Sequence, residues 1–483
     1  MSDPRYVAVI DIGKTNAKLV LHDMATTTDV VVHRTTNASL PGPPYPHVDV
    51  ERLWGFICDA LSRVAAEHRI DAISMTTHGA CAALLSAIGP GANPEDPGLS
   101  LPILDYEATP PAALSIAYDR LRPDFEETAS PALPNGLNLG RQLFWLEQAF
   151  PEDFARTRCI VTYPQYWAFR LTGETACDAS SLGCHTDLWQ PHAGTFSSLV
   201  EMRGWQHLFA PVRSSFAVLG TLRPEIAARV GLGDSPVPVH AGIHDSNASL
   251  LPYLLQRPAP FSVISTGTWV ISFAVGGKPV ALDPARDTLS NVDALGRATP
   301  SGRFMGGREF EVLTEGTSRP PTEAELARVL AAGLMVLPSF APGTGPFPTG
   351  AGVWTRDPAA LSAGERTAVA SLYAALLSLT DLLLIGAEGP IIVEGPFATN
   401  TVYRDCLAAV SGRPVILLES ATGTSAGAAL LALGETRLRD HAIKPPSHQT
   451  ADQAGAPPLR AELYRAYARQ WHEAVAGHVA SRP

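Results

Sequence analysis

The stretch YVAVIDIGKTNAKLVLHD, from Tyr6 to Asp23, decides how the start of the chain folds. Its apolar runs, Val7 to Ile10 and Leu19 to Leu21, read as two short buried strands. The bend between and beside them carries Asp11, Gly13, Lys14, Thr15, Asn16 and Lys18. A tight turn needs a glycine and accepts an asparagine, but it has no need of an acid, a hydroxyl and two lysines. The stretch therefore predicts a β-hairpin whose turn carries chemistry.

The turn residues suit a phosphate group. Gly13 lets the backbone approach a ligand closely, and successive N–H groups in such a turn can face an anion. Thr15 offers a hydroxyl and Lys18 a cation, while Asp11 at the strand end suits a hydrated Mg²⁺. The spacing is not that of a Walker loop. An ordinary hairpin turn with surface lysines remains the alternative.

Composition limits the classes of function. The chain has 483 residues, which predicts more than one domain, and its net charge of −11 excludes a nucleic-acid surface that needs clustered Lys and Arg. No apolar run approaches the roughly 18 residues that span a bilayer, and no signal peptide is visible. Six scattered cysteines are typical of reduced thiols. These observations predict a cytoplasmic protein without a nucleic-acid or membrane partner.

The order of predicted elements indicates an α/β fold. A β-meander over the first 35 residues leads into an amphipathic helix at 51–69 and a strand at 72–79. Further strands and helices are expected at 261–272, 371–386, 390–400, 414–420, 423–434 and 460–472. We predict domains at residues 1–248 and 249–435, with a helical tail at 436–483 that packs back on the first domain.

A second hairpin and an acid repeat the logic of the first. STGTW (Ser265 to Trp269) places Gly267 and Thr268 in a turn between two apolar strands. Two such hairpins, one in each half, suggest two phosphate clamps that face each other across a cleft, although each alone reads as a plain meander turn. Just upstream, Asp245 in the sequence HDS follows a strand, where it suits a general base. Its other reading is a cap for a helix that starts near Asn247.

Taken in order, these motifs resemble those of the FGGY family of carbohydrate kinases, from about residue 6 to residue 435. The first phosphate motif is matched by Asp11, Gly13, Thr15 and Lys18, the second by Gly267 and Thr268, and the catalytic aspartate by Gly242 and Asp245. The segment from Val393 to Asn400 stands where the family has its adenosine loop. Two departures are Glu-Gly-Pro in that loop and Lys14 in place of a small or hydroxyl residue.

The resemblance implies the fold and the site. It implies two actin/hexokinase-like (ribonuclease H-like) domains around a central cleft, with ATP and Mg²⁺ as cofactors. The implied sugar contacts are His78, Asp105, Tyr106 and Glu107; the implied ATP contacts are Gly13, Thr15, Asn16, Lys18, Gly267, Thr268, Gly395 and Asn400; the implied metal contacts are Asp11 and Asp245.

The implied activity is phosphorylation of a terminal hydroxyl of a ketose, with Asp245 as the general base. The HDS and STGTW motifs are most similar to those of rhamnulokinases and fuculokinases, so rhamnulose, fuculose or a related ketose is expected. The expected partner is a small-molecule sugar, and a homodimer is allowed for. The alternatives are an ATP-driven switch like actin or the heat-shock chaperones, and a degenerate sugar sensor, which is disfavoured because no catalytic group is missing.

Overall fold

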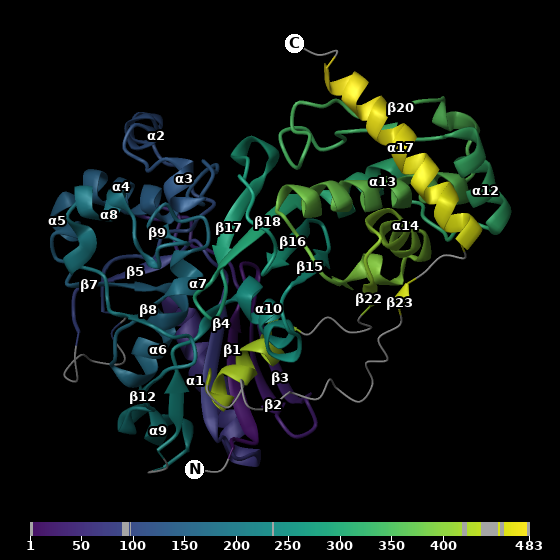
Figure 1. Ribbon diagram of the computed structural model, residues 1–483. Helices are drawn as coiled ribbons and strands as arrows, with labels where there is room; N and C mark the ends of the chain where they lie inside the picture. The colour runs from purple at the N-terminus through teal and green to yellow at the C-terminus, as the bar shows by residue number, and fades with distance from the viewer. Residues whose placement is uncertain are drawn as a thin grey trace. The chain divides into compact units, whose positions relative to one another are not determined.

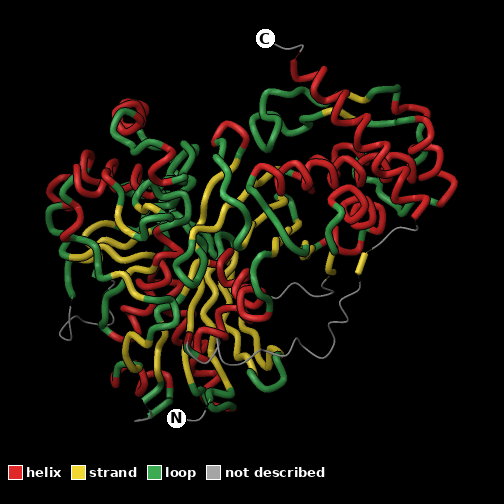
Figure 2. The backbone as a smooth tube through the Cα atoms, in the orientation of Figure 1, coloured by secondary structure: helices red, strands yellow, loops and turns green. Residues whose placement is uncertain are grey.

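The computed structural model describes residues 3–88, 96, 98–233, 236–417, 423–435, 453–454 and 458–480. The chain forms two compact units, each with its own sheet and helices (Figures 1 and 2). The first unit comprises Met1–Gln256, Ser290–Ala298 and Thr422–Lys444, and the second comprises Arg257–Leu289, Thr299–Ala421 and Pro445–Pro483. The expected α/β class with two domains is confirmed.

The domain limits differ from those predicted. The predicted limit at residue 248 falls inside helix α10 (Asp245–Gln256), and the first unit ends at the last residue of that helix. The first unit also includes the later segments Ser290–Ala298 and Thr422–Lys444, which a single predicted boundary in the sequence assigns to the second domain. Helix α17 (Pro458–Ala480) belongs to the second unit rather than to the first, because its buried Tyr464 and Trp471 join the core of that unit. The predicted tail before residue 453, and residues 418–420 of a predicted strand, lie outside the described residues.

The first unit is built on a sheet with the order β12-β13-β4-β1-β2-β3, in which β14 also pairs with β4. Strand β1 runs antiparallel to β2 and parallel to β4, so the N-terminal meander is confirmed. The register sets Asp11 beside Lys18 on one side and beside Thr76 on the other, which brings the polar strand ends to one edge. The strands are β1 (Tyr6–Ile12), β2 (Asn16–Asp23), β3 (Thr28–Thr36), β4 (Ala72–Thr77), β12 (Val218–Thr221), β13 (Pro238–His240) and β14 (Ile243–His244).

Strand β1 is buried on both faces, and its alternating side chains enter two different cores. Ala8 and Ile10 join a large core with α1 (Val50–Glu67), a helix capped by Asp49. Val7 and Val9 join a smaller core with α10 and with α15 (Thr424–Ala429). Helix α15 therefore lies against the same sheet that carries the first hairpin.

The rest of the first unit surrounds a three-stranded sheet, with the order β6-β5-β7, and several helices. These elements are β5 (Ala82–Leu85), β6 (Leu99–Leu101), α2 (Ala112–Asp119), α3 (Phe125–Thr128), α4 (Leu139–Ala149), α5 (Pro151–Phe154), β7 (Cys159–Thr162), α6 (Tyr163–Thr172), β8 (Cys177–Asp178), α7 (Ala179–Leu182), β9 (Trp189–Gln190), β10 (Thr195–Phe196), α8 (Ser198–Met202), β11 (Val212–Arg213) and α9 (Pro224–Val230).

The second unit is built on a sheet with the order β17-β18-β16-β15-β21-β22-β23. The strands of this sheet are β15 (Phe261–Thr266), β16 (Val270–Val275), β18 (Ala298–Phe304), β21 (Ile391–Glu394), β22 (Val415–Leu417), β23 (Gln453–Ala454) and β17 (Thr288–Val292), of which the part from Ser290 onward is assigned to the first unit. Its helices are α11 (Gly306–Thr314), α12 (Glu323–Ala332), α13 (Ala363–Leu384), α14 (Thr401–Ser411) and α17, and a small hairpin joins β19 (Val336–Leu337) to β20 (Val353–Trp354). Helix α14 was not foreseen from the sequence.

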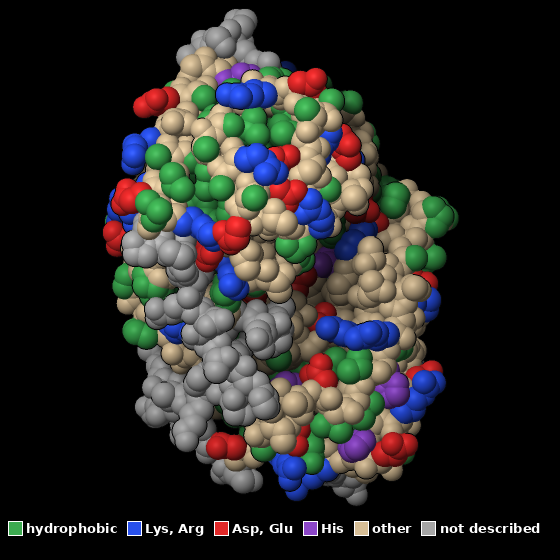
Figure 3. Space-filling model, turned by 90° about the vertical axis from the view of Figure 1, so that its right-hand side faces the viewer, with side chains coloured by type: hydrophobic (Ala, Val, Ile, Leu, Met, Phe, Trp, Pro, Cys, Tyr) green, Lys and Arg blue, Asp and Glu red, His purple; other side chains and the backbone are tan. Residues whose placement is uncertain are grey.

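Helix α13 is long and apolar enough to span a bilayer by length and composition, and 83% of its apolar window is buried in the structure. On the face shown in Figure 3, Lys and Arg side chains are interspersed with Asp and Glu side chains. All six cysteines carry reduced thiols, and each is buried.

One buried acid in the second unit has no hydrogen-bond partner among the described residues. Asp381, on α13, is 0% exposed, and both of its carboxylate oxygens lack a partner. Burial, reinforced by the charge of Asp287, raises the pKa of Asp381 well above the ordinary value. The Asp381 carboxyl of the folded protein therefore keeps its proton at pH values at which the same group in the unfolded chain has released it.

We expect Asp381→Asn to flatten the dependence of stability on pH. Because the folded pKa is raised, the stability of the wild type falls as pH rises above about 4, by up to about 1.4 kcal/mol per pH unit for one proton. Urea unfolding at pH 5 and pH 8 measures the slope, with the exposed Asp59→Asn as matched control. Equal slopes for Asp381→Asn and wild type would contradict a protonated Asp381.

Candidate active site

The first hairpin turn is closed by its own backbone and held by a neighbouring asparagine. The Gly13 N–H donates to the Asn16 carbonyl at 2.9 Å, and Asn37 Nδ2 donates to the Gly13 carbonyl at 2.7 Å. Thr15 and Asn16 are exposed, with Asn16 Nδ2 3.0 Å from the Thr15 hydroxyl. These residues are accessible to a ligand, as the phosphate hypothesis requires.

Asp11 is buried at the end of β1, and its contacts come from two distant parts of the chain. Its Oδ2 accepts hydrogen bonds from the hydroxyls of Thr424 (2.5 Å) and Ser425 (2.8 Å), and lies 3.2 Å from Lys18 Nζ. Lys18 is thus paired with an acid rather than free. Thr424 and Ser425 were predicted only as part of the element expected at 423–434. In the structure they hold Asp11 within the first unit.

Asp245 is the first residue of α10, immediately after β14. Its Oδ1 accepts the Ser246 N–H at 2.6 Å, and its side chain is 30% exposed. Burial of the carboxyl raises the pKa of Asp245 to about 6, with the charge of Asp11 adding to it and His78 and Ser246 opposing it. A carboxylate of this strength is well matched to accept a proton near neutral pH. The helix start and the candidate base are the same residue.

His244 lies beside Asp245 and is buried. Its Nδ1 is 3.4 Å from Asn247 Nδ2, and its Nε2 is 3.2 Å from Asp245 Oδ1. Burial lowers the pKa of His244 to about 4, so the ring is neutral. Because the Asn247 amide nitrogen can only donate, Nδ1 accepts from it and the proton lies on Nε2, whose hydrogen-bond partner is Cys184 Sγ at 3.7 Å.

The predicted sugar-side residues come together in the first unit. The Nδ1 of the buried His78 is 2.9 Å from the Gly79 carbonyl, so it donates, and Nε2 keeps its lone pair. Burial lowers the pKa of His78, although Asp245 acts to raise it. The ring packs at 5.3 Å from the Tyr106 ring and 5.0 Å from Tyr163. His78 is therefore positioned as an acceptor for a hydroxyl.

Lys14 was not predicted as a site residue, yet it contacts all three residues of the segment 105–107. Its ammonium forms an ion pair with Asp105, lies 3.3 Å from Glu107 Oε2 and sits 4.9 Å from the centre of the Tyr106 ring. Although burial acts to raise the pKa of Asp105, hydrogen bonds from Lys14 and Ser39 outweigh it and hold that pKa below its usual value. The signal in the sequence was a lysine where the family has a small residue.

The acids of the first unit fit a hydrated divalent cation. Bonds engage Oδ2 of Asp11 and Oδ1 of Asp245, which leaves the other oxygen of each carboxylate, and the two charges are close enough for Asp11 to raise the pKa of Asp245. Within the part of the chain that the structure describes, no group of three His, Cys, Asp or Glu residues could hold a metal. Two carboxylates that each keep one oxygen outside these bonds suit Mg²⁺, which keeps several waters and takes one or two carboxylates together with phosphate oxygens.

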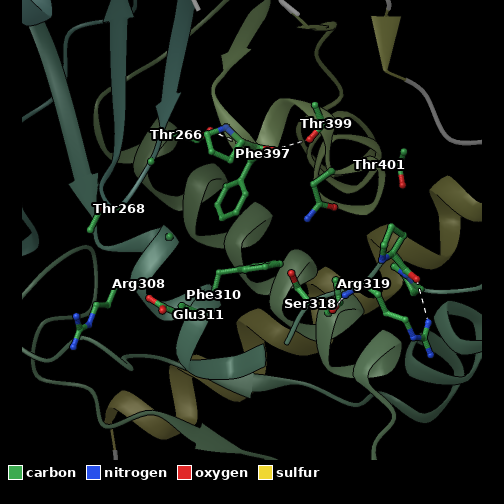
Figure 4. Close-up of a pocket in the computed structure, with 17 residues that line it drawn as sticks. Thr266, Thr268, Arg308, Phe310, Glu311, Ser318, Arg319, Phe397, Thr399 and Thr401 are labelled. Atoms are coloured by element: carbon green, nitrogen blue, oxygen red, sulfur yellow. Dashed lines mark hydrogen bonds between the residues drawn. The ribbon is translucent and has the colours of Figure 1, made fainter. Parts of the chain in front are cut away.

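A cavity of about 730 Å³ opens in the second unit, at the turn between β15 and β16. The rings of Phe310 and Phe397, whose centres are 5.4 Å apart, point into it (Figure 4). Thr268 and Arg308 lie at one end and Arg319 and Thr401 at the other (Figure 4). The lining comprises Thr266, Gly267, Thr268, Gly307, Arg308, Phe310, Glu311, Ser318, Arg319, Pro320, Pro321, Thr367, Pro396, Phe397, Thr399, Asn400 and Thr401. An apolar centre with polar ends suits a nucleotide.

The predicted nucleotide residues of this unit divide into two groups. Gly267, Thr268 and Asn400 line the cavity, whereas Gly395 does not. Gly395 has φ +82°, and a Cβ there would lie 2.1 Å from the Thr266 carbonyl oxygen, so it allows two loops to touch. The Asn400 side chain accepts the Tyr403 N–H and donates to Ser371 at 2.8 Å, which makes it the cap of α14. Its predicted contact with adenosine stays a prediction.

Sequence reasoning missed the contribution of α11 to the cavity. Gly307, Arg308, Phe310 and Glu311 come from this helix, and Ser318 and Arg319 follow it. The available signal was the pair Gly306-Gly307, one residue after strand β18, because a glycine pair that opens a helix allows close approach to a loop or ligand.

Comparisons with known proteins agree with the geometry. The model described as "Carbohydrate kinase FGGY, C-terminal domain" matches residues 258–441, and "FGGY family of carbohydrate kinases, N-terminal domain" matches residues 133–252. The autoinducer-2 kinase of Salmonella typhimurium is 23% identical over 270 residues, which cover 55% of this chain and 50% of that protein. The probable L-xylulose kinase of Pasteurella multocida is 24% identical, with 55% of each chain covered. The chain spans about half the length of the curated relatives it matches.

Solved structures match over the full chain. A carbohydrate kinase from Novosphingobium aromaticivorans is 37% identical, with 99% of each chain covered and a TM-score of 0.87. The Plasmodium falciparum glycerol kinase solved with ADP shares only the fold, at 13% identity, with 98% of each chain covered and a TM-score of 0.76. With two matching domain models and a full-length relative at 37% identity, the chain belongs to the FGGY family of carbohydrate kinases.

Proposed function

We propose that this protein transfers the terminal phosphate of ATP to a terminal hydroxyl of a ketose. The observation that carries the proposal is Asp245, a partly buried carboxylate with a raised pKa, placed near His78 in a chain whose other unit holds a nucleotide-sized cavity. Family membership supports the reaction class, and the polar sugar-side residues favour a sugar over water as the acceptor.

The residues of the first unit would bind and deprotonate the acceptor. His78 Nε2 accepts one sugar hydroxyl, and Asp105 holds another part of the sugar through its carboxylate. Asp245 takes the proton of the attacking hydroxyl as the new O–P bond forms and the bond to the ADP oxygen breaks. When bound, Mg²⁺ would supply charge neutralisation on the phosphate oxygens near Asp11 and Asp245.

The residues of the second unit would bind the nucleotide. Phe310 and Phe397 offer apolar rings for the base, and Gly267 and Thr268 offer a turn for the phosphates. In this proposal the phosphates lie toward the end of the cavity at which Figure 4 shows Thr268 and Arg308. Thr15 and Lys18 of the first hairpin stay the predicted phosphate contacts of the first unit.

The sugar we favour is rhamnulose, fuculose or a related ketose. The support is the pair of motifs HDS and STGTW. The relatives' names, autoinducer-2 kinase and probable L-xylulose kinase, add autoinducer-2 and L-xylulose to the candidate substrates. The cytoplasm, where ATP is abundant and thiols stay reduced, is the expected compartment.

ADP release with Mg-ATP across a panel of ketoses, polyols and aldoses tests the proposal. We expect one class of ketose to raise turnover far above the rate without sugar. Steady hydrolysis of ATP that no sugar stimulates would favour the alternative, an ATP-driven switch of the actin type.

A further inference from the structure

Two lysines leave the first hairpin in different directions. Lys18 pairs with Asp11 on the sheet, at 3.2 Å from its Oδ2. Lys14, in the turn itself, pairs instead with Asp105 and Glu107 and lies over the ring of Tyr106. A lysine in a phosphate-binding turn would be expected to extend toward the anion, but this ammonium is already neutralised by two carboxylates.

Besides Lys14, the segment is held by a hydrogen bond from Ser39 to the Asp105 carboxylate and by single backbone bonds. The Asp105 N–H donates to Pro46, and the Gly136 N–H donates to the Tyr106 carbonyl at 2.8 Å. Asp105 Oδ1, the oxygen bound by Lys14, also accepts the Glu107 N–H at 2.9 Å. One carboxylate oxygen thus links the turn of the segment to the turn of the hairpin.

The Tyr106 ring carries this link to His78. It packs edge-on against the His78 ring at 5.3 Å, and Lys14 lies near the same ring. Lys14, segment 105–107 and His78 therefore form one contiguous cluster, defined here as the Lys14 cluster. Removing the ammonium would leave Asp105, whose side chain is 9% exposed, without its main counter-charge.

We propose that Lys14 is a sugar-side positioning residue and not a phosphate ligand: its ammonium fixes Asp105 and Tyr106, and thereby the acceptor pocket, to the β1–β2 hairpin. The expected effect on the sugar KM rests on the proposed function, whereas the expected effect on the position of segment 105–107 does not. It makes Lys14 a determinant of sugar specificity that works through its neighbours.

The two acidic partners of Lys14 differ in how strongly they depend on its charge. The Asp105 side chain is 9% exposed, whereas that of Glu107 is 64% exposed. A paired charge that is shielded from water depends strongly on its partner, while an exposed pair contributes little. Asp105 is therefore the partner through which Lys14 acts, and Glu107 is secondary.

The KM values for sugar and for ATP distinguish a sugar-side positioning role of Lys14 from a role as a phosphate ligand. We expect Lys14→Met to raise the KM for the sugar on the order of tenfold or more, while the KM for ATP changes less than about twofold. Glu107→Gln should raise the sugar KM by less than about threefold. Lys14→Arg, which keeps the charge, should recover part of the loss. A rise in the KM for ATP with an unchanged sugar KM would show a phosphate ligand and overturn the proposal.

Hydrogen exchange in the ligand-free protein tests the link without any reaction. We expect the amide of Glu107 to exchange faster in Lys14→Met than in wild type, because its acceptor on Asp105 is no longer fixed. Unchanged exchange there would overturn the link. If wild type phosphorylates no sugar, the proposed function fails, and the exchange measurement still decides the role of Lys14.

Discussion

Asp245→Asn is expected to lower sugar-dependent ADP release by about 10³-fold, within the range for loss of a general base. The amide is nearly isosteric with the carboxylate, so it keeps an oxygen for the Ser246 N–H, but it cannot accept the proton of the attacking hydroxyl. The nucleotide cavity lies in the second unit. We therefore expect the affinity for ATP to fall only by the contribution of the one metal contact that Asp245 would make. Calorimetric titration with ATP and an assay of ADP release measure the two effects separately.

The pH profile gives an independent check on the same residue. A base must be deprotonated to act, and the pKa of Asp245 is raised to about 6 by burial. The kcat/KM for the sugar in wild type should therefore rise with pH and level off above about pH 6. The residual activity of Asp245→Asn should lack this acid limb, whereas the exposed Asp59→Asn should keep it. Near-normal turnover in Asp245→Asn would disprove the assignment of the base.

Sequence patterns predicted the first hairpin well because its information is local. Two antiparallel strands are specified by three local features. The apolar side chains of β1 enter two cores in alternation, a glycine lies in the turn, and a second apolar run follows it. The candidate base was predicted for the same reason, since an acid directly after a short strand is visible in the sequence. Helix α10 begins at Asp245, two residues before the predicted start near Asn247.

Contacts between distant segments could not be predicted. The hydroxyl of Thr424 is 413 residues from Asp11 in sequence, and nothing in either stretch indicates that they bond. Lys14 and Asp105 are 91 residues apart, and from the sequence Lys14 was seen only as a departure from the family motif or as a surface lysine. Local patterns specify elements, while the pairing of polar side chains depends on tertiary packing.

The same limit explains the outcome in the adenosine loop. Gly395 and Asn400 were expected to contact the nucleotide because their segment resembles the family's adenosine loop, which follows a strand. The structure gives Gly395 a close approach to Thr266 and Asn400 the cap of α14, two roles that any loop between a strand and a helix needs. Their residue types fit both purposes, so the sequence alone does not separate them.

Gly307→Ala is expected to weaken nucleotide binding on the order of tenfold or more, since overpacking a close contact typically costs about 1–3 kcal/mol. A Cβ at Gly307 would lie 2.1 Å from the Gly267 carbonyl oxygen and 3.1 Å from the Cα of Thr268. Both neighbours are backbone atoms of the second hairpin, so the clash is relieved only if α11 or the hairpin turn moves. Titration of the protein with ATP, or with ADP if hydrolysis interferes, measures the loss.

A matched glycine in the same unit shows whether the effect belongs to the contact. Gly477, on α17, is exposed and has nothing within 4 Å of a built Cβ, so Gly477→Ala should keep nucleotide affinity and stabilise the helix by up to about 1 kcal/mol. If Gly307→Ala unfolds at a lower urea concentration but binds ATP as wild type does, the glycine serves folding alone. Weaker binding with little change in sugar KM would instead assign the α11–hairpin contact to the nucleotide site, because the sugar-side residues lie in the first unit.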